Sequence, residues 1–346
     1  METVNEKLKQ WAIKKIESEF RDDVCLLLEH KLLRLDKDIE SGKIGLESYV
    51  PNTTRSNALA RTFIIDGIGY DLFPQTWERL EKMADVNHYN LTCLDNASVT
   101  WARSGADRQR FESLQAKLRA NLKNPRLMLE RAQNWVNTAS ELFADTLFEE
   151  RTHIIRQNAG YICDLLSIAI AHTNGTYFHR RQIGQPDQLR KMSLIPGNFI
   201  GTYEKIICEK NIDMQKKLCH SLLRMTKDHI RVLAQDAEPH KRSAAELAGW
   251  YHELSYTWRR IYHCCETGDA AGAYLWACML QKELGDVAEE YNAPDIDILG
   301  AFDTGNLKAF AEHAAKGERA VIKAIEADGG RIDAYSSIDE FLEKNS

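Results

Sequence analysis

Apolar positions change their spacing along this chain, from short strand-like runs before residue 123 to helical spacing after it. The uninterrupted apolar run at residues 24–28 predicts a strand buried on both faces, and residues 44–51 predict a second strand that ends at its proline. The stretch "RTFIIDGIGYDLFP" at residues 61–74 reads as two short strands joined by an Asp-Gly turn. These runs predict a small sheet.

Helical patterns surround and follow these strands. Residues 75–86 and 105–122 predict helices, the first with Thr76 as its N-cap, while residues 89–94 and 97–103 look like further short strands. Long helical patterns then occupy the rest of the chain, at residues 125–149, 151–173, 198–209, 212–235, 242–266, 270–291 and 307–327. We therefore expect an α+β fold, with a small mixed sheet and its helices in a domain at residues 1–123 and a helical bundle domain at residues 124–346.

Composition narrows the classes of partner. The 346 residues carry a net charge of −6, and no basic patch appears of the kind that binds nucleic acid, so nucleic acid is not expected as a main partner. The longest apolar run, at residues 162–171, contains Asp164 and is far shorter than the ~20 residues that span a bilayer. The eight cysteines show no paired spacing, and the first twenty residues suit an amphipathic helix better than a signal peptide. We expect a reduced, cytoplasmic protein without a membrane segment.

One carboxylate, Asp71, stands inside the second strand of the predicted hairpin. Aspartate is disfavoured in strands, so Asp71 either lies on a solvated edge, paired with Arg61 or Arg55, or lies where charge is needed. Two further acids, Asp36 and Asp38, are two residues apart and would share one face if extended, although a solvated turn explains them as well.

The runs "DDVCLLLEH", "RTFIIDGIGYDLFP" and "TWERLE" resemble the amino-terminal part of nucleotidyltransferases of the polymerase-β superfamily. The similarity is to aminoglycoside-type members with a helical carboxy-terminal domain, and it covers about the first 120 residues. It implies transfer of a nucleotidyl group from ATP or another NTP to a hydroxyl of a small molecule, with Mg²⁺. It also implies Asp71, Asp36 and Asp38 as candidate metal ligands, and these three with Glu47 as candidate catalytic acids.

Two motifs of that family are degraded in this chain. After Leu28 the sequence reads "EHKLL", without the Gly-Ser turn that would hold a triphosphate, and the second strand carries Glu47 where an Asp-x-Asp pair is expected. Two functions therefore stay open: a magnesium-dependent nucleotidyltransferase, or a catalytically inactive homologue that binds a ligand or a protein. The sequence does not specify the acceptor, the nucleotide or the oligomeric state.

The helical region adds further candidate functional residues, for which the pattern is less specific. Glu149 and Glu150 at a helix junction are either a base for an acceptor hydroxyl or an acidic helix end. The stretch "GTYFHRRQIGQPDQLRKM" at residues 175–192 is rich in Tyr, His and Arg, and we expect it to line a ligand cleft between the two predicted domains.

Overall fold

The computed structural model describes residues 3–30, 46–237 and 242–345. The chain divides into two compact units, Met1–Ala237 and Glu238–Ser346, and each is described by itself. The domain boundary predicted at residues 123 and 124 lies inside the first unit, between two helices, and stays a prediction.

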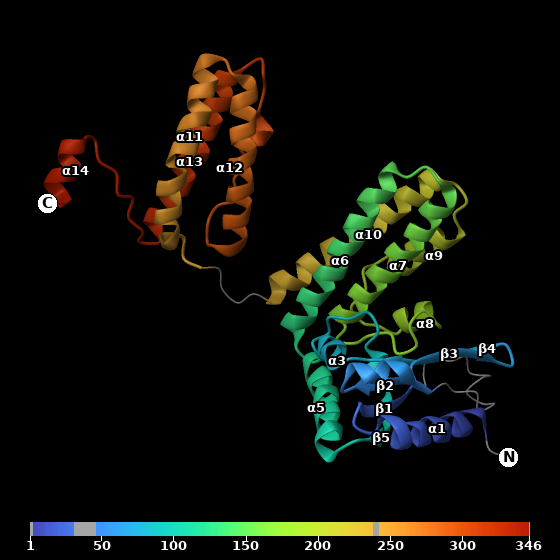
Figure 1. Cartoon of the computed structure of the whole chain (residues 1–346). Helices are drawn as coiled ribbons and strands as arrows, with labels where there is room; N and C mark the ends of the chain where they lie inside the picture. The colour runs from blue at the N-terminus through green and yellow to red at the C-terminus, as the bar shows by residue number, and fades with distance from the viewer. Residues whose placement is uncertain (1–2, 31–45, 238–241, 346) are drawn as a thin grey trace. The chain divides into compact units, whose positions relative to one another are not determined.

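A mixed five-stranded sheet forms the base of the first unit (Figure 1). In the order β3-β4-β2-β1-β5, the strands are β3 (Arg61–Ile65), β4 (Ile68–Pro74), β2 (Leu46–Pro51), β1 (Val24–His30) and β5 (Ala97–Ala102). Neighbouring strands run antiparallel except β2 and β4, which are parallel. With the helices that follow, this sheet confirms the predicted α+β class.

Both faces of the sheet are covered by helices. Leu26 and Leu28 of β1 pack in one hydrophobic cluster with α3 (Trp77–Ala84) and α5 (Gly105–Asn121). Leu27 of β1 packs in another cluster with α1 (Val4–Lys15), on the opposite face of the sheet (Figure 1). Alternate residues of a strand point to opposite faces, so a strand covered on both sides is apolar throughout. This explains why the run at residues 24–28 is uninterrupted.

Local signals set the turns and caps of this region. Asp66 and Gly67 both have positive φ, 50° and 74°, as the two-residue hairpin turn requires. The hydroxyl of Thr76 accepts a hydrogen bond from the backbone N–H of Arg79, which confirms Thr76 as the N-cap of α3.

The strand predicted at residues 89–94 is wrong. Residues Thr92–Asp95 form a short helix, α4, which packs on α5 through buried Leu91, Cys93 and Leu94. A short apolar run suits a strand and a buried helical turn equally, so its periodicity does not separate the two. Here the side-chain amide of Gln115 donates hydrogen bonds to the carbonyl oxygens of Leu94 and Ala97 and holds the turn between α4 and β5.

A helical bundle completes the first unit. Its helices are α6 (Pro125–Phe148), α7 (Thr152–Thr173), α8 (Gln185–Leu189), α9 (Phe199–Cys208) and α10 (Ile212–Ala237). Their apolar stripes share one core, in which the middle of α7 is buried. Each long helical pattern predicted in this region is confirmed. These helices were predictable because their apolar stripes repeat at helical spacing over many turns.

The second unit is a helical bundle with its own core. It contains α11 (Ala248–Thr267), α12 (Ala270–Glu290), α13 (Leu307–Ala327) and the short α14 (Ile338–Asn345). Trp258 is fully buried in that core, and the hydroxyl groups of Tyr251 and Tyr262 both donate hydrogen bonds to the carboxylate of Glu318 on α13. Across the described part of both units, no helix combines the length and apolar character needed to cross a bilayer.

Candidate functional site

Asp71 is an exposed residue of β4. It pairs across the hairpin with Thr62, whose hydroxyl donates a hydrogen bond to its carboxylate over 3.0 Å. Neither predicted arginine pairs with it in the described part of the chain: Arg55 binds the carboxylate of Asp23, and Arg61 binds the backbone carbonyl oxygens of Ala58 and Ala60. The pairing of β4 with β2 begins at Phe73, so Asp71 lies two residues before it.

The structure does not bring the other predicted acids to Asp71. Asp36 and Asp38 lie outside the described residues, and Glu47 belongs to β2 with its side chain outside the described part. Within the described ranges, no three His, Cys, Asp or Glu side chains gather closely enough to hold a metal ion. Among the described residues, therefore, no other acids lie close enough to Asp71 to complete a Mg²⁺ site with it.

The end of β1, where the resemblance implies a phosphate turn, is a closed and buried cluster. The carboxylate of Glu29 accepts hydrogen bonds from Asn5 and from the ammonium group of Lys9, over 2.7 and 3.1 Å. The ring Nε2 of His30 lies 2.8 Å from the hydroxyl of Ser48, and both side chains are buried. Burial lowers the pKa of His30 to about 4, so its ring is neutral at pH 7.

A pocket lies beside the middle of α7. Its empty space is about 370 Å³, a volume that includes the open solvent at its mouth. Three segments line this α7 pocket: His88, Tyr89 and Leu91 after α3; Asp164, Ile168 and His172 of α7; and five residues between Tyr177 and Gln185. The last segment is part of the loop at residues 175–192, so that loop forms a pocket wall. Its role in binding a ligand stays a prediction.

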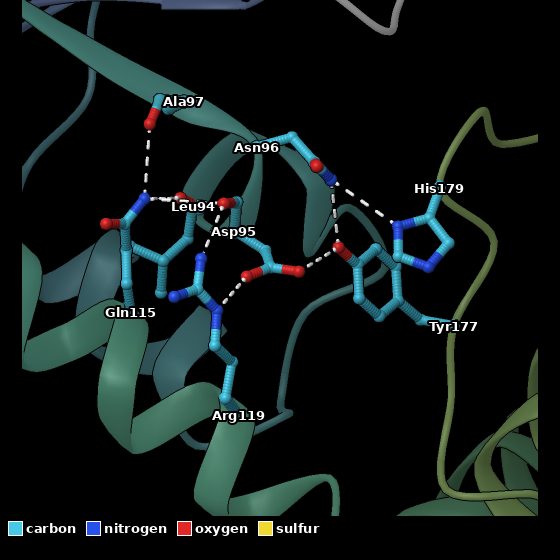
Figure 2. Close-up of polar contacts among 8 residues, drawn as sticks. All are labelled: Leu94, Asp95, Asn96, Ala97, Gln115, Arg119, Tyr177 and His179. Carbon is cyan, nitrogen blue, oxygen red and sulfur yellow. Dashed lines mark hydrogen bonds and ion pairs between the residues drawn. The ribbon is translucent and has the colours of Figure 1, made fainter.

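A polar network ties this loop to the sheet region (Figure 2). The hydroxyl of Tyr177 donates a hydrogen bond to Asp95 over 2.7 Å and accepts one from the amide of Asn96 over 3.0 Å. Arg119 of α5 binds the other carboxylate oxygen of Asp95 over 2.8 Å. Asp95 thus bridges α5 and the loop, and Tyr177 is fixed as a wall of the pocket.

Two polar side chains of the α7 pocket, His172 and Gln185, are buried. His172 is 1% exposed, and its Nδ1 has no hydrogen-bond partner among the described residues. Burial, together with the charge of Arg131, lowers the pKa of His172 to about 3, so the ring is neutral. The two carboxylate oxygens of Asp164 accept hydrogen bonds from the amides of Gln185 and Gln182, over 2.7 and 2.9 Å. A buried imidazole nitrogen without a partner is costly unless something binds it.

The junction glutamates lie outside this pocket's lining. The carboxylate of Glu149 binds the guanidinium of Arg151 and accepts a hydrogen bond from the backbone N–H of Glu150. The side-chain hydrogen bond from Arg151 is the main cause that lowers the pKa of Glu149 to about 2. A carboxylate this acidic is a weak general base at neutral pH, so the geometry favours the acidic helix end.

Gly175 starts the loop that carries the pocket wall. Its φ is +64°, and a Cβ atom added there would lie 2.9 Å from the carbonyl oxygen of Leu122. We expect Gly175→Ala to lower the free energy of unfolding by about 1–2 kcal/mol, because both the backbone and the space favour glycine. Urea denaturation measures this change.

Gly160 is the matched control, since it lies on the exposed side of α7 with nothing within 4 Å of an added Cβ. Gly160→Ala should leave stability unchanged or raise it by about 0.5–1 kcal/mol, because alanine favours the helix. Equal effects of the two substitutions would show that the loop entry is not constrained as described.

Sequence patterns located only part of this site. The composition of the loop at residues 175–192 signalled a pocket wall, but nothing marked His88, Tyr89, Asp164 or His172 as neighbours. Asp164 and His172 are eight residues apart on one helix, and an amphipathic helix core explains them without a ligand.

Comparisons with known proteins find a distant likeness among solved structures. No family model matches the chain, and no curated protein matches it. Among solved structures, the chain is similar to a nucleotidyltransferase-like protein from Exiguobacterium sibiricum, with a TM-score of 0.36 and 11% sequence identity. That match covers 71% of this chain and 87% of the other.

Proposed function

We propose that this chain is a nucleotidyltransferase-like protein that binds a small molecule with a polar ring, such as a nucleoside, in the α7 pocket. The observation that carries the proposal is His172 in the wall of that pocket, whose buried Nδ1 has no hydrogen-bond partner among the residues that the structure describes. In this reading the chain is the inactive homologue of its family, acting as a ligand-binding module.

The pocket lining suits a flat polar ligand. Tyr89, Tyr177 and Phe178 supply aromatic surface, and the ring of His172 supplies a hydrogen-bonding group. The side-chain amides of Gln182 and Gln185 hold Asp164 in the pocket wall. The space of about 370 Å³ includes open solvent at the mouth, so the pocket would enclose one end of a ligand and leave the rest exposed.

Nucleotidyl transfer with magnesium is the second candidate, favoured by the exposure of Asp71 on β4. It would need Asp36, Asp38 or Glu47 to join Asp71 as metal ligands, and the described residues do not form that set. Bound Mg²⁺ would bridge the phosphates of an NTP and the acids, with a small-molecule hydroxyl as acceptor.

The redox state of the cysteines supports a cytoplasmic location, which stays a proposal. All eight cysteines are free, and Cys25, Cys93, Cys163, Cys219 and Cys264 are buried. Unpaired thiols persist in reducing compartments.

Calorimetry with ATP separates the two candidates. We expect ATP to bind the full chain equally well with and without MgCl₂, and Asp71→Asn to leave that binding unchanged. Tyr89→Ala should weaken it about tenfold, because stacking of a base on an aromatic ring contributes about 1–3 kcal/mol. Tyr161→Ala is the control, since Tyr161 is an exposed tyrosine of α7 that does not line the pocket.

Two results would contradict the ligand-binding proposal. Magnesium-dependent ATP binding that Asp71→Asn weakens would favour the enzyme. Absence of binding by both ATP and adenosine at millimolar concentration would remove the pocket as a nucleoside site.

A further inference from the structure

Cationic and aromatic side chains meet at one corner of the α7 pocket. The guanidinium of Arg181 lies 5.2 Å from the centre of the Tyr89 ring, and that ring stacks on His88 with 4.6 Å between centres. Arg181 is exposed, and its guanidinium lies over Tyr89 without an acidic partner in the described ranges. Its charge is therefore left for another partner.

A second arginine lies near the same corner. Arg79 of α3 stacks over Phe73, and its Nε is buried without a hydrogen-bond partner in the described part of the chain. Burial is the main cause that lowers the pKa of His88, to about 4, and the charges of Arg79, Arg181 and Lys82 lower it further. Lys82 is itself paired with Glu78 on α3. The charged side chains that lower the pKa of His88 are thus all cations.

His88 presents a hydrogen-bond donor in this positive corner. The backbone N–H of Asn90 donates to its Nδ1 over 3.0 Å. Because the neutral ring carries one proton and Nδ1 accepts, that proton is on Nε2. The guanidinium of Arg181 and this ring N–H both contact or neighbour Tyr89 at the pocket, and both are donors of the kind that bind phosphate oxygens.

The backbone at this corner is strained on both sides. Val86, two residues before His88, has a φ of 55°, and Arg181 has a φ of 52°. The third non-glycine residue with positive φ in the described ranges is Asp66, in the hairpin turn. The loop near Arg181 is held in place by a hydrogen bond of 2.7 Å, which the hydroxyl of Thr92 donates to the carbonyl oxygen of His179. This bond helps to keep Arg181 in its strained conformation. Strained residues of this kind gather where function needs a particular side-chain direction.

We propose that this corner of the α7 pocket is an anion subsite that binds the phosphate group of the ligand through Arg181 and His88, with Arg79 adding positive charge. The proposal rests on the proposed function and deepens it, since it makes the ligand a phosphorylated molecule. Its phosphate lies at the mouth of the pocket on Arg181, and its ring lies beside Tyr89, on the side toward His172.

Titration calorimetry of the full chain with adenosine, AMP and inorganic phosphate tests the subsite. We expect AMP to bind at least about tenfold more tightly than adenosine, in line with the strength of charge-assisted hydrogen bonds from arginine to phosphate. Arg181→Gln should remove that difference and leave adenosine binding unchanged. Arg156→Gln, at an exposed arginine of α7 outside the pocket lining, is the matched control and should keep it.

The histidine ring signals in an NMR titration give a second readout. AMP should shift the signal that His88→Gln removes, and should raise the pKa of His88, because a nearby anion favours the imidazolium form.

The outcomes separate the two proposals. Equal binding of AMP and adenosine, or an equal loss of both in Arg181→Gln, would overturn the anion subsite and leave the nucleoside pocket standing. Absence of binding by AMP and adenosine would overturn the proposed function. If inorganic phosphate then still binds and needs Arg181, the subsite is a site for free phosphate, and a phosphorylated ligand is contradicted.

Discussion

Tyr177→Ala should lower the free energy of unfolding by about 3–5 kcal/mol, the range for removing a large buried aromatic side chain. Tyr177 is 6% exposed and packs in the hydrophobic cluster that contains α3 and α5. The substitution also removes the hydroxyl group that joins the pocket loop to Asp95 and Asn96. Urea denaturation of the variant measures the loss, and the same preparation should bind ATP more weakly.

Two comparison variants separate the contributions of Tyr177. Tyr177→Phe keeps the ring and should cost about 1.5–3 kcal/mol, the value of a hydrogen bond to a charged group. Tyr161→Ala, at a tyrosine that is 57% exposed, should change stability by no more than about 0.5 kcal/mol. A Tyr177→Ala effect as small as that of Tyr161→Ala would mean that the loop is not held to the sheet region.

Acid should destabilise the first unit between about pH 6.5 and 4.5, before most carboxylates are protonated. The folded-state pKa of His30 is about 4 and that of His172 about 3, both below the value near 6.5 of an unfolded histidine. Their neutral rings therefore favour folding fully above pH 6.5. That contribution is lost as the pH falls toward the folded pKa values, because the unfolded chain then binds more protons.

The size of the acid effect follows from the number of protons. Each buried histidine should cost about 1.4 kcal/mol per pH unit within this window, and urea denaturation at a series of pH values measures the slope. His30→Gln and His172→Gln should each reduce this slope by the contribution of one proton. The control His153→Gln, at an exposed residue of α7, should leave the slope unchanged. A slope unchanged by both buried substitutions would contradict neutral burial of these rings.

Much of the fold was predictable because its signals are local. The apolar run of β1, the Asp-Gly turn and the Thr76 cap each depend on a few neighbouring residues, and the long helices repeat one pattern over many turns. α4 was missed because a six-residue apolar stretch does not distinguish a strand from a helical turn that docks on α5.

The candidate site was harder to predict because its parts are far apart in sequence. Asp71 stood out through its unusual place in a strand, yet its folded environment is a solvated edge with Thr62. The α7 pocket joins His88, His172 and Arg181, which meet only after α7 packs and Tyr177 binds Asp95. Such long-range packing leaves no spacing rule in a single sequence.

A crystal structure of the full chain with a non-hydrolysable ATP analogue and magnesium tests the central claim most directly. The account predicts the adenosine ring in the α7 pocket beside Tyr89 and a phosphate on Arg181, with Asp71 free of ligand. A triphosphate beside Asp71, bridged by ions to Asp36, Asp38 or Glu47, would contradict it and establish the nucleotidyltransferase site instead.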